Sequence, residues 1–217
     1  MSTVWLWQTN LPPVNENEAL RYAGVKENMP EMNALLQECI QLCKNSLTPR
    51  VCYAFYPVAR QEGMLDLGFA KTGSASLKRN LAGCGEIVLF AATIGLEMDR
   101  LIARYAQLSP ARSVMLQAIG AERIEALCDA FENELIRQGH EVNTRFSPGY
   151  GDLPLEMQRD IFAALDCARH IGVSLNESLL MSPSKSVSAI IGLDGERNER
   201  CLHNCAACTL KECLYRR

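Results

Sequence analysis

The sequence predicts an α+β fold in which a largely antiparallel, twisted sheet is flanked by helices. Helical and strand-like segments both occur along the 217 residues, but they do not alternate as the repeating strand–helix unit of a parallel sheet. Two runs rich in β-branched and aromatic residues are the strongest strand candidates: RVCYAFYPV at 50–58 and GEIVLFAATIG at 85–95. A chain of this length can bury a substantial core.

The first part of the chain predicts an arm, two helices and a hairpin. Residues 1–15 carry two tryptophans and two prolines without a regular period, which indicates an arm or a leading strand. The apolar spacing is helical in residues 17–24 and 30–43. The strand at 50–58 is followed by MLDLGF at 64–69, which we expect to be its hairpin partner.

The second part predicts mostly helices, and a last strand ends the domain. Besides the strand at 85–95, the expected elements are a short helix at 74–81, helices at 96–106, 109–138 and 155–171, and a strand at 185–193, KSVSAIIGL. The composition changes after Leu193, where the chain becomes charged and rich in cysteine. We therefore expect one domain at 1–193 and a metal-binding tail at 194–217.

Charge and composition exclude several classes of partner. A formal net charge of −3 gives no reason to expect nucleic acid or an anionic membrane as the main partner. No apolar run reaches the roughly 18 residues of a membrane-spanning helix. Residues 1–10 contain no basic residue, so they do not have the pattern of a secretion signal. We expect a cytoplasmic protein.

Cysteine is unusually frequent, with ten residues, and four of them lie close together near the C-terminus. The six scattered cysteines suit small core positions. The clustered four, in CLHNCAACTLKEC, are Cys201, Cys205, Cys208 and Cys213. Four thiolates can hold a structural zinc ion or a 4Fe–4S cluster. His203 is a conceivable alternative ligand, and a reduced tail without metal stays open.

The segment RFSPGYGDLP at 145–154 frames a rigid turn with an arginine and a tyrosine. A Pro-Gly turn lets backbone N–H groups approach a ligand closely. Arg145 can hold a carboxylate through two hydrogen bonds, and Tyr150 offers a ring face and a hydroxyl group. Together these groups would suit an amino acid joined to a nucleoside. The alternative is a surface loop with an arginine ion pair and a tyrosine that closes the core.

Two ordered motifs resemble the activation domain of cobalamin-dependent methionine synthase. The first is the Arg-x-x-x-Gly-Tyr motif of that family, met here by Arg145, Gly149 and Tyr150. The second is its Thr-Glu-Ser…Met-x-Pro…Ser-Val-Ser pattern, in which Asn176 replaces the threonine and the remaining residues match. With TPRVCYAFYPVAR and IVLFAATIGLEMD upstream, the likeness covers roughly residues 48–193.

The resemblance implies the fold of that activation domain and a site for S-adenosylmethionine. In this interpretation Arg145 holds the methionyl carboxylate, while the backbone from Ser147 to Gly149 and the ring of Tyr150 face the adenosine part. A carboxylate of the preceding helix would meet the amino group of the ligand. Glu125 is the best placement; a shift of one residue puts Ala126 there, and Glu122 is another candidate.

The resemblance further implies reductive activation of a cobalamin-dependent methionine synthase. The chain is too short for the homocysteine, folate and cobalamin modules, so it resembles a free-standing domain that presents the methyl group to cob(I)alamin on a separate corrinoid protein. A flavodoxin, a ferredoxin or the 4Fe–4S tail would supply the electron.

The chain departs from the pattern of the large enzymes after Ser-Val-Ser, where it lacks the tyrosine-bearing segment that helps to enclose their ligand. The alternatives are a non-enzymatic S-adenosylmethionine sensor, a zinc-binding module and a reactivator of another corrinoid methyltransferase.

Overall fold

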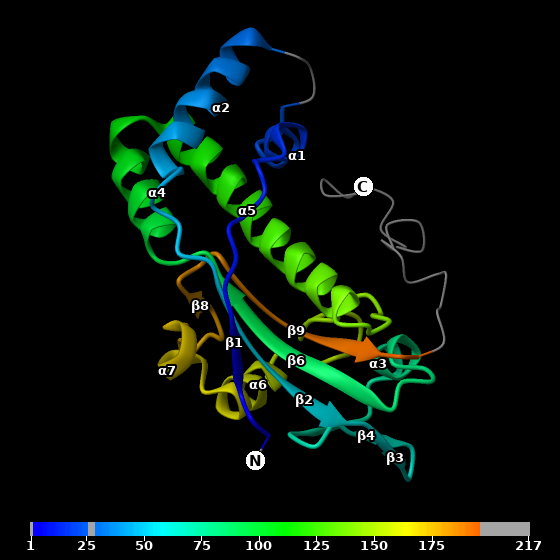
Figure 1. Cartoon of the computed structure of the whole chain (residues 1–217). Helices are drawn as coiled ribbons and strands as arrows, with labels where there is room; N and C mark the ends of the chain where they lie inside the picture. Colours follow the sequence, from blue (N-terminus) through cyan, green and yellow to red (C-terminus); the bar gives the residue numbers. More distant parts are fainter. Residues whose placement is uncertain (1, 26–28, 196–217) are drawn as a thin grey trace.

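The centre of the molecule is a four-stranded antiparallel sheet, seen in a computed structural model that describes residues 2–25 and 29–195 (Figure 1). The strand order is β1-β2-β6-β9, and every neighbouring pair is antiparallel. The strands are β1 (Trp5–Trp7), β2 (Arg50–Pro57), β6 (Glu86–Thr93) and β9 (Ser186–Leu193). The predicted α+β class is confirmed, and the N-terminal arm does contain a strand.

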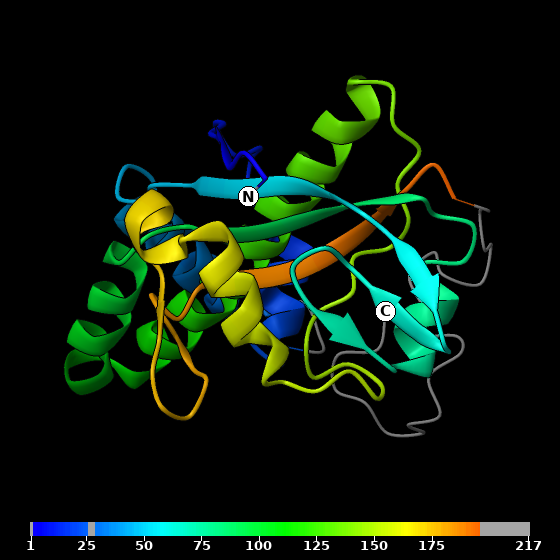
Figure 2. The same cartoon turned by 90° about the horizontal axis from the view of Figure 1, so that it is seen from below.

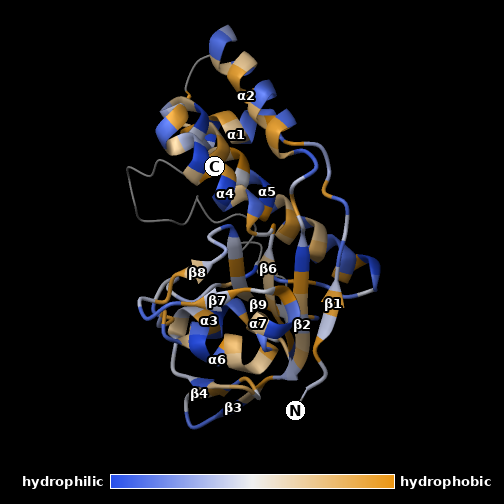
Figure 3. Cartoon of the chain, turned by 90° about the vertical axis from the view of Figure 1, so that its left-hand side faces the viewer, coloured by the Kyte–Doolittle hydropathy of each residue, from blue (hydrophilic) through white to orange (hydrophobic). Residues whose placement is uncertain are grey.

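Both faces of this sheet are buried, and alternate residues of each strand point to opposite faces. In β6, Val88 and Phe90 belong to one hydrophobic cluster, whereas Ile87 and Leu89 belong to the other. This explains why the strand reads as a continuous apolar run in the sequence. Figure 3 shows the apolar residues along the strands and on the helix faces that cover them.

One face of the sheet is covered by the long helix α5 (Pro110–Arg137) (Figure 1). The helices α1 (Glu16–Tyr22), α2 (Pro30–Cys43) and α4 (Glu97–Leu108) pack against α5. The long α5 crosses the sheet, and its Phe131 is 1% exposed. The ring centroid of Phe131 lies 5.0 Å from that of Tyr53 and 5.2 Å from that of Phe90. These aromatic contacts join α5 to β2 and β6.

The opposite face is covered by α3 (Ala75–Asn80), α6 (Met157–Leu165) and α7 (Cys167–Ile171), and Figure 2 shows α6 and α7 in yellow in front of the strands. The single helix predicted at 155–171 is divided in two. Asp166 ends α6 with a left-handed backbone, φ 45° and ψ 52°. Aspartate tolerates this conformation better than most residues, but its presence alone does not predict a break.

The predicted pairing of residues 64–69 with the strand at 50–58 is wrong. β4 (Met64–Asp66) pairs instead with β3 (Ala59–Gln61) and with β5 (Lys71–Thr72). Glu62 and Gly63, with φ 49° and 75°, form a two-residue connection that brings Gln61 opposite Met64. Because β4 pairs with β3 in this tight hairpin, it does not pair with β2, and the neighbours of β2 are β1 and β6.

The MSPSKSVS segment forms a structured entry into β9, after the short strands β7 (Ser174–Leu175) and β8 (Met181–Ser182). The hydroxyl of Ser186 donates to the carbonyl of Pro183 and lies 2.9 Å from that of Thr93. Asp99 accepts hydrogen bonds from the backbone and side chain of Ser184. The hydroxyl groups of this motif thus satisfy a turn, as their type suggests.

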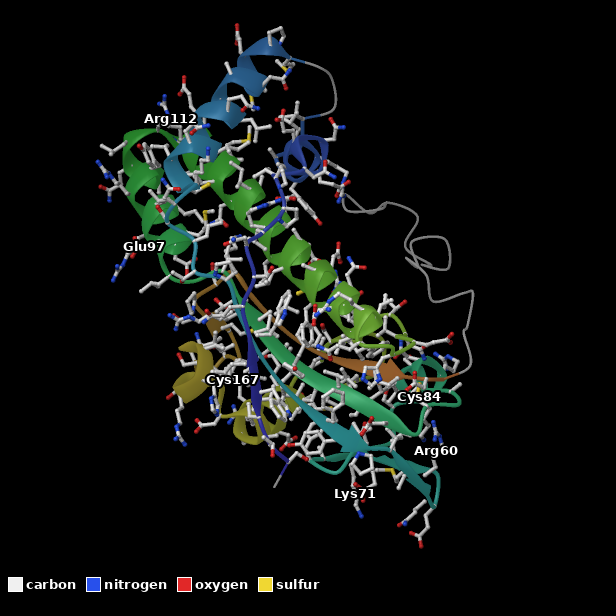
Figure 4. All side chains as sticks on the ribbon, in the orientation of Figure 1. Arg60, Lys71, Cys84, Glu97, Arg112 and Cys167 are labelled. Atoms are coloured by element: carbon white, nitrogen blue, oxygen red, sulfur yellow. The ribbon has the colours of Figure 1, made fainter. Side chains whose placement is uncertain are left out.

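The six scattered cysteines are all buried with free thiols, which agrees with small core positions. Figure 4 labels Cys84 near the end of β9, where Arg60 donates a 3.1 Å hydrogen bond to its carbonyl group. Within residues 2–25 and 29–195, no helix combines the length and the apolar character that spanning a membrane requires.

Candidate functional site

The predicted turn follows a short stretch of chain that runs beside β9. Phe146 and Ile190 exchange two backbone hydrogen bonds of 2.8 and 3.0 Å. The turn is closed by a hydrogen bond from the Tyr150 amide to the Ser147 carbonyl, at 3.1 Å. Gly149 has a φ of 88°, in the region that glycine adopts without strain. The backbone itself therefore fixes the conformation of the Ser-Pro-Gly-Tyr turn.

Asp152 fastens this turn to the start of α3. Its carboxylate accepts hydrogen bonds from the Ser74 hydroxyl at 2.6 Å and from the amides of Ala75 and Ser76 at 2.7 and 3.0 Å. The Ser74 hydroxyl and then the two amides lower the pKa of Asp152. A Cβ on Gly151 would lie 2.6 Å from the Ser76 hydroxyl oxygen, so glycine allows the close approach.

Arg145 points toward α5 and is surrounded by carboxylates. Glu125, Asp129 and Glu132 occupy one face of α5 because they are spaced four and three residues apart. Arg145 Nη2 lies 2.6 Å from Glu125 Oε2, and Nη1 lies 2.8 Å from Asp129 Oδ1 and 2.5 Å from Glu132 Oε1. Only 18% of the Arg145 side chain is exposed. Both terminal nitrogens of the guanidinium thus already have carboxylate partners.

The three carboxylates differ in exposure and therefore in their freedom to leave the arginine. The side chains of Glu125 and Asp129 are 36% and 52% exposed, whereas that of Glu132 is 21% exposed. Burial raises the pKa of Glu132. Burial opposes the charge of Arg145, but Glu132 and Glu125 outweigh it and raise the pKa of the guanidinium. Arg145 is therefore a permanent cation, and Glu125 is one of its two more exposed partners.

The other residues predicted for the ligand lie in the turn. Ser147 is half-buried and Gly149 is exposed. Tyr150 is 60% exposed, and its ring meets that of Phe146 edge to face at a centroid distance of 6.1 Å. Partial burial and the Glu125 carboxylate raise the pKa of Tyr150. This phenol therefore belongs to the same electrostatic environment as Arg145 and Glu125, and does not close the core.

A groove with a volume of about 660 Å³ runs between α5 and the N-terminal segment. The α5 side of the groove is formed by Glu122, Glu125, Ala126, Asp129, Ala130 and Asn133. The opposite side is formed by Pro12, Pro13, Asn15, Glu18, Arg21 and Tyr22. Among the predicted site residues, Glu125 lines the groove. Arg145 is not one of the lining residues, but it forms ion pairs with two of them, Glu125 and Asp129. The volume lies within the range of about 300–1,000 Å³ typical of small-molecule sites.

Glu122, the alternative carboxylate, is engaged in holding the N-terminal segment. It is 5% exposed and forms an ion pair with Arg123, which is 3% exposed. Glu122 also accepts a 3.1 Å hydrogen bond from the Asn15 amide, and Arg123 donates to the carbonyls of Pro12 and Pro13. This buried pair fixes the segment that forms the second side of the groove.

The second side of the groove was not predicted from the sequence. Arg21 and Tyr22 lie about a hundred residues before Glu125 in the chain and belong to no recognisable motif. The contact depends on the position of α1 over α5, which local periodicity does not specify. The two prolines at 12 and 13, which interrupt any regular structure before α1, are the one feature of the sequence that marks this segment.

The predicted metal ligands Cys201, Cys205, Cys208 and Cys213, with the alternative ligand His203, lie outside the described residues. Between Ser2 and Gly195, leaving out residues 26–28, no group of three or more histidine, cysteine, aspartate or glutamate side chains could hold a metal ion.

Comparison with known proteins identifies the family. The model of the vitamin B12 dependent methionine synthase activation domain matches residues 77–199. Among solved structures, the MetH reactivation domain bound to AdoHcy has the same fold, with a TM-score of 0.65 and 19% sequence identity. The alignment covers 88% of this chain and 78% of that domain. No curated protein matches the chain. Since the family model spans more than half of its residues, the chain belongs to the family of vitamin B12 dependent methionine synthase activation domains.

Proposed function

We propose that the chain binds S-adenosylmethionine in the groove between α5 and the N-terminal segment, and that it presents the methyl group to a cobalamin on a separate protein. The family and the AdoHcy bound to the MetH reactivation domain support this proposal. AdoHcy is what remains of S-adenosylmethionine after methyl transfer. The observation that carries the proposal is the position of Glu125, which lines the groove and lies 2.6 Å from Arg145.

The Arg145–Glu125 pair can recognise an amino acid by exchanging partners. Arg145 Nη2 is paired with the partly exposed Glu125, while Nη1 is paired with Asp129 and Glu132. A ligand carboxylate would replace Glu125 at Nη2, and Glu125 would then accept a hydrogen bond from the ligand ammonium group. Each charge would keep a partner throughout, which limits the free-energy cost of desolvation. The exchange reconciles the ligand role predicted for Arg145 with its ion pairs.

The charge of the groove favours a cationic ligand. Glu18, Glu122, Glu125 and Asp129 line it. Glu18 is paired with Arg21 and Glu122 with Arg123, but Arg145 is shared by Glu125, Asp129 and Glu132, so the carboxylates outnumber the arginines. S-adenosylmethionine carries a sulfonium and an ammonium group against one carboxylate, so its net charge is positive. An excess of nearby carboxylates attracts such a molecule more strongly than the neutral sulfur of AdoHcy. The groove is therefore suited to take up the methyl donor and release its product.

The turn would serve the adenosine part of the ligand. Gly149 is exposed and carries no Cβ, so the backbone from Ser147 to Gly149 can approach a ligand closely. The exposed ring of Tyr150 offers a planar surface to a purine. Asp152 attaches the turn that carries this ring to the start of α3.

The partner in this proposal is a cobalamin-dependent methionine synthase or another corrinoid protein, with a flavodoxin or a ferredoxin as electron donor. Reduced cobalamin on the partner supplies the nucleophile that takes the methyl group. No side chain of this chain then has to act as a base. Its own contribution is to position the sulfonium group and to exclude water.

Calorimetric titration of the full chain with S-adenosylmethionine tests the proposal. We expect binding by the native chain and a loss of at least about 30-fold in affinity for Arg145→Ala, because a charged hydrogen-bonding partner of the carboxylate is removed. The control is Arg137→Ala, which removes an exposed arginine at the end of α5 that is paired with Glu134 at 2.6 Å. Equal affinities of the native chain and Arg145→Ala would contradict the carboxylate role.

A second assay tests the activation step itself. The native chain, S-adenosylmethionine and a reductant are mixed with an inactive, oxidised methionine synthase, and methylation of the corrinoid is followed by its visible spectrum. We expect methylation only when the chain and S-adenosylmethionine are both present. Binding of S-adenosylmethionine without any methylation would instead support the sensor alternative.

A further inference from the structure

A second cavity, with a volume of about 410 Å³, lies where β1 ends and β2 begins. One wall is formed by residues 8–10, which follow β1, and the other by residues 48–50, which lead into β2. The cavity shares no lining residue with the groove beside α5. It also contains none of the residues that the proposed function uses. Its own lining therefore has to indicate what it binds.

Arg50 is the charged side chain of this cavity, and the other lining residues are uncharged: Gln8, Thr9, Asn10, Thr48 and Pro49. Arg50 is exposed, and among residues 2–25 and 29–195 it has no hydrogen-bond, ion-pair or ring partner for its guanidinium. Exposed arginines on the helices differ in this respect, since Arg100 and Arg137 are paired with glutamates. The cavity thus presents a cation that no lining carboxylate compensates.

The wall that carries Arg50 is fixed by the central sheet. The amide of Thr48 donates a 2.9 Å hydrogen bond to the carbonyl of Ile94, and Arg50 lies opposite Thr93 in the pairing of β2 with β6. A Cβ on Gly95 would lie 2.1 Å from the hydroxyl oxygen of Thr48, so glycine is needed for this close approach. The position of Arg50 is therefore set before any ligand binds, which lowers the cost of binding.

The opposite wall is anchored at its beginning. Trp7, the residue before this wall, pairs with Val51 of β2, and its ring centroid lies 5.6 Å from that of Phe131. Within the wall, the hydroxyl of Thr9 donates a 3.3 Å hydrogen bond to the carbonyl of Asn10. The amide side chains of residues 8 and 10 are thereby held at the edge of the same cavity as Arg50.

We propose that this cavity binds a phosphate group, with the guanidinium of Arg50 as its main contact. A guanidinium can donate two parallel hydrogen bonds to a phosphate. The side-chain amides of Gln8 and Asn10 and the hydroxyl of Thr48 can donate further hydrogen bonds without competing for the cation. The volume is within the range of small-molecule sites, so it leaves room for the organic part of a phosphate ester. This proposal does not depend on the proposed function.

Tryptophan fluorescence of the full chain tests the proposal. The two tryptophans, Trp5 and Trp7, both lie in β1, directly before the wall of residues 8–10. Inorganic phosphate and glycerol phosphate are titrated separately at constant ionic strength, so that screening does not change. We expect a saturable change with a dissociation constant on the order of 1 mM. Tighter binding of the ester would identify a phosphorylated small molecule as the occupant, and equal binding would identify inorganic phosphate.

Two variants and a control assign the effect to the cavity. Arg50→Gln should weaken phosphate binding at least about tenfold, because a charge-assisted hydrogen bond is lost. Asn10→Asp keeps the size of the side chain but adds a carboxylate, which repels phosphate and can pair with Arg50, so it should have a similar effect. Arg169→Gln is the control, because this exposed arginine of α7 also has no partner in the described part of the chain but does not line the cavity.

The outcomes that would overturn the proposal are specific. Native phosphate affinity in Arg50→Gln would overturn it, and so would an equal loss in Arg169→Gln, since binding would then follow only the net charge. A response to chloride as large as the response to phosphate would exclude a phosphate site as well. Phosphate binding by a chain that does not bind S-adenosylmethionine would support this site while the proposed function failed.

Discussion

Asp152 Oδ1 accepts a 2.6 Å hydrogen bond from Ser74 Oγ, and this contact joins the Ser-Pro-Gly-Tyr turn to the first residues of α3. The same carboxylate accepts hydrogen bonds from the amides of Ala75 and Ser76. Ser74 in turn caps α3 by accepting a hydrogen bond from the Leu77 amide. The Gly151-Asp152 pair of RFSPGYGDLP is therefore a point of attachment, and it fixes the turn that carries Tyr150.

Asp152→Asn should lower the unfolding temperature at pH 7 by about 2–4 °C, since one helix-capping carboxylate is lost. The folded pKa of Asp152 is lowered, so its contribution is present above the unfolded value of about 3.9 and is lost as the pH falls below it. The difference between native and variant unfolding temperatures should therefore shrink near pH 3. Asp160→Asn, in an exposed aspartate of α6, is the control. A difference that stayed constant with pH would argue against the role of the charge.

Residues 50–58 and 85–95 could be identified as strands because buried strands are continuous and rich in β-branched and aromatic residues. The pairing of 64–69 could not be identified, since it depends on the positive φ angles of Glu62 and Gly63. A glutamate at such a position carries no turn signal. The strand that pairs with it, Ala59–Gln61, is exposed and short, so its sequence has no apolar alternation to detect.

Gly151→Ala should destabilise the fold by about 1–3 kcal/mol through overcrowding and a strained backbone. The added Cβ would lie 2.6 Å from Ser76 Oγ and 2.8 Å from Ser76 Cβ, at a φ of 54°. Gly63→Ala is a matched control, because its φ is 75° and nothing lies within 4 Å of the added atom. Denaturant unfolding measures both changes. Adding Ser76→Gly to Gly151→Ala should recover the steric part, and no recovery would show that the contact is unimportant.

Arg123→Ala should destabilise the protein by about 3–5 kcal/mol, because Glu122 would remain buried without its counter-charge. The variant also removes the donor to the carbonyls of Pro12 and Pro13. We therefore expect the N-terminal segment to become more sensitive to proteolysis than the rest of the chain. Arg137→Ala, in an exposed pair, should change stability little. Equal effects of the two variants on urea unfolding would contradict this account.

The candidate site, like the strand pairing, could be predicted only in part, because some of its contacts join segments that are distant in the sequence. Arg145, Gly149 and Tyr150 lie within six residues, so a local motif reveals them. Glu125 could be placed only within one helical turn, because the resemblance left Glu122 and, by a shift of one residue, Ala126 as alternatives. The ion pairs that saturate Arg145, and the approach of Arg21 on α1, arise from helix packing between distant segments. No local pattern encodes such a contact.

The cysteine tail gives the last prediction. Four thiolates within thirteen residues can converge on one metal centre, and we propose that Cys201, Cys205, Cys208 and Cys213 hold a 4Fe–4S cluster. Protein purified without oxygen should then be brown and contain iron and sulfide in equal amounts. Cys205→Ser should lose the colour and most of the iron, whereas Cys128→Ser, in a buried core cysteine, should keep both. Stoichiometric zinc without sulfide would replace the cluster by a structural zinc site. Protein without any metal would leave the electron to an external donor.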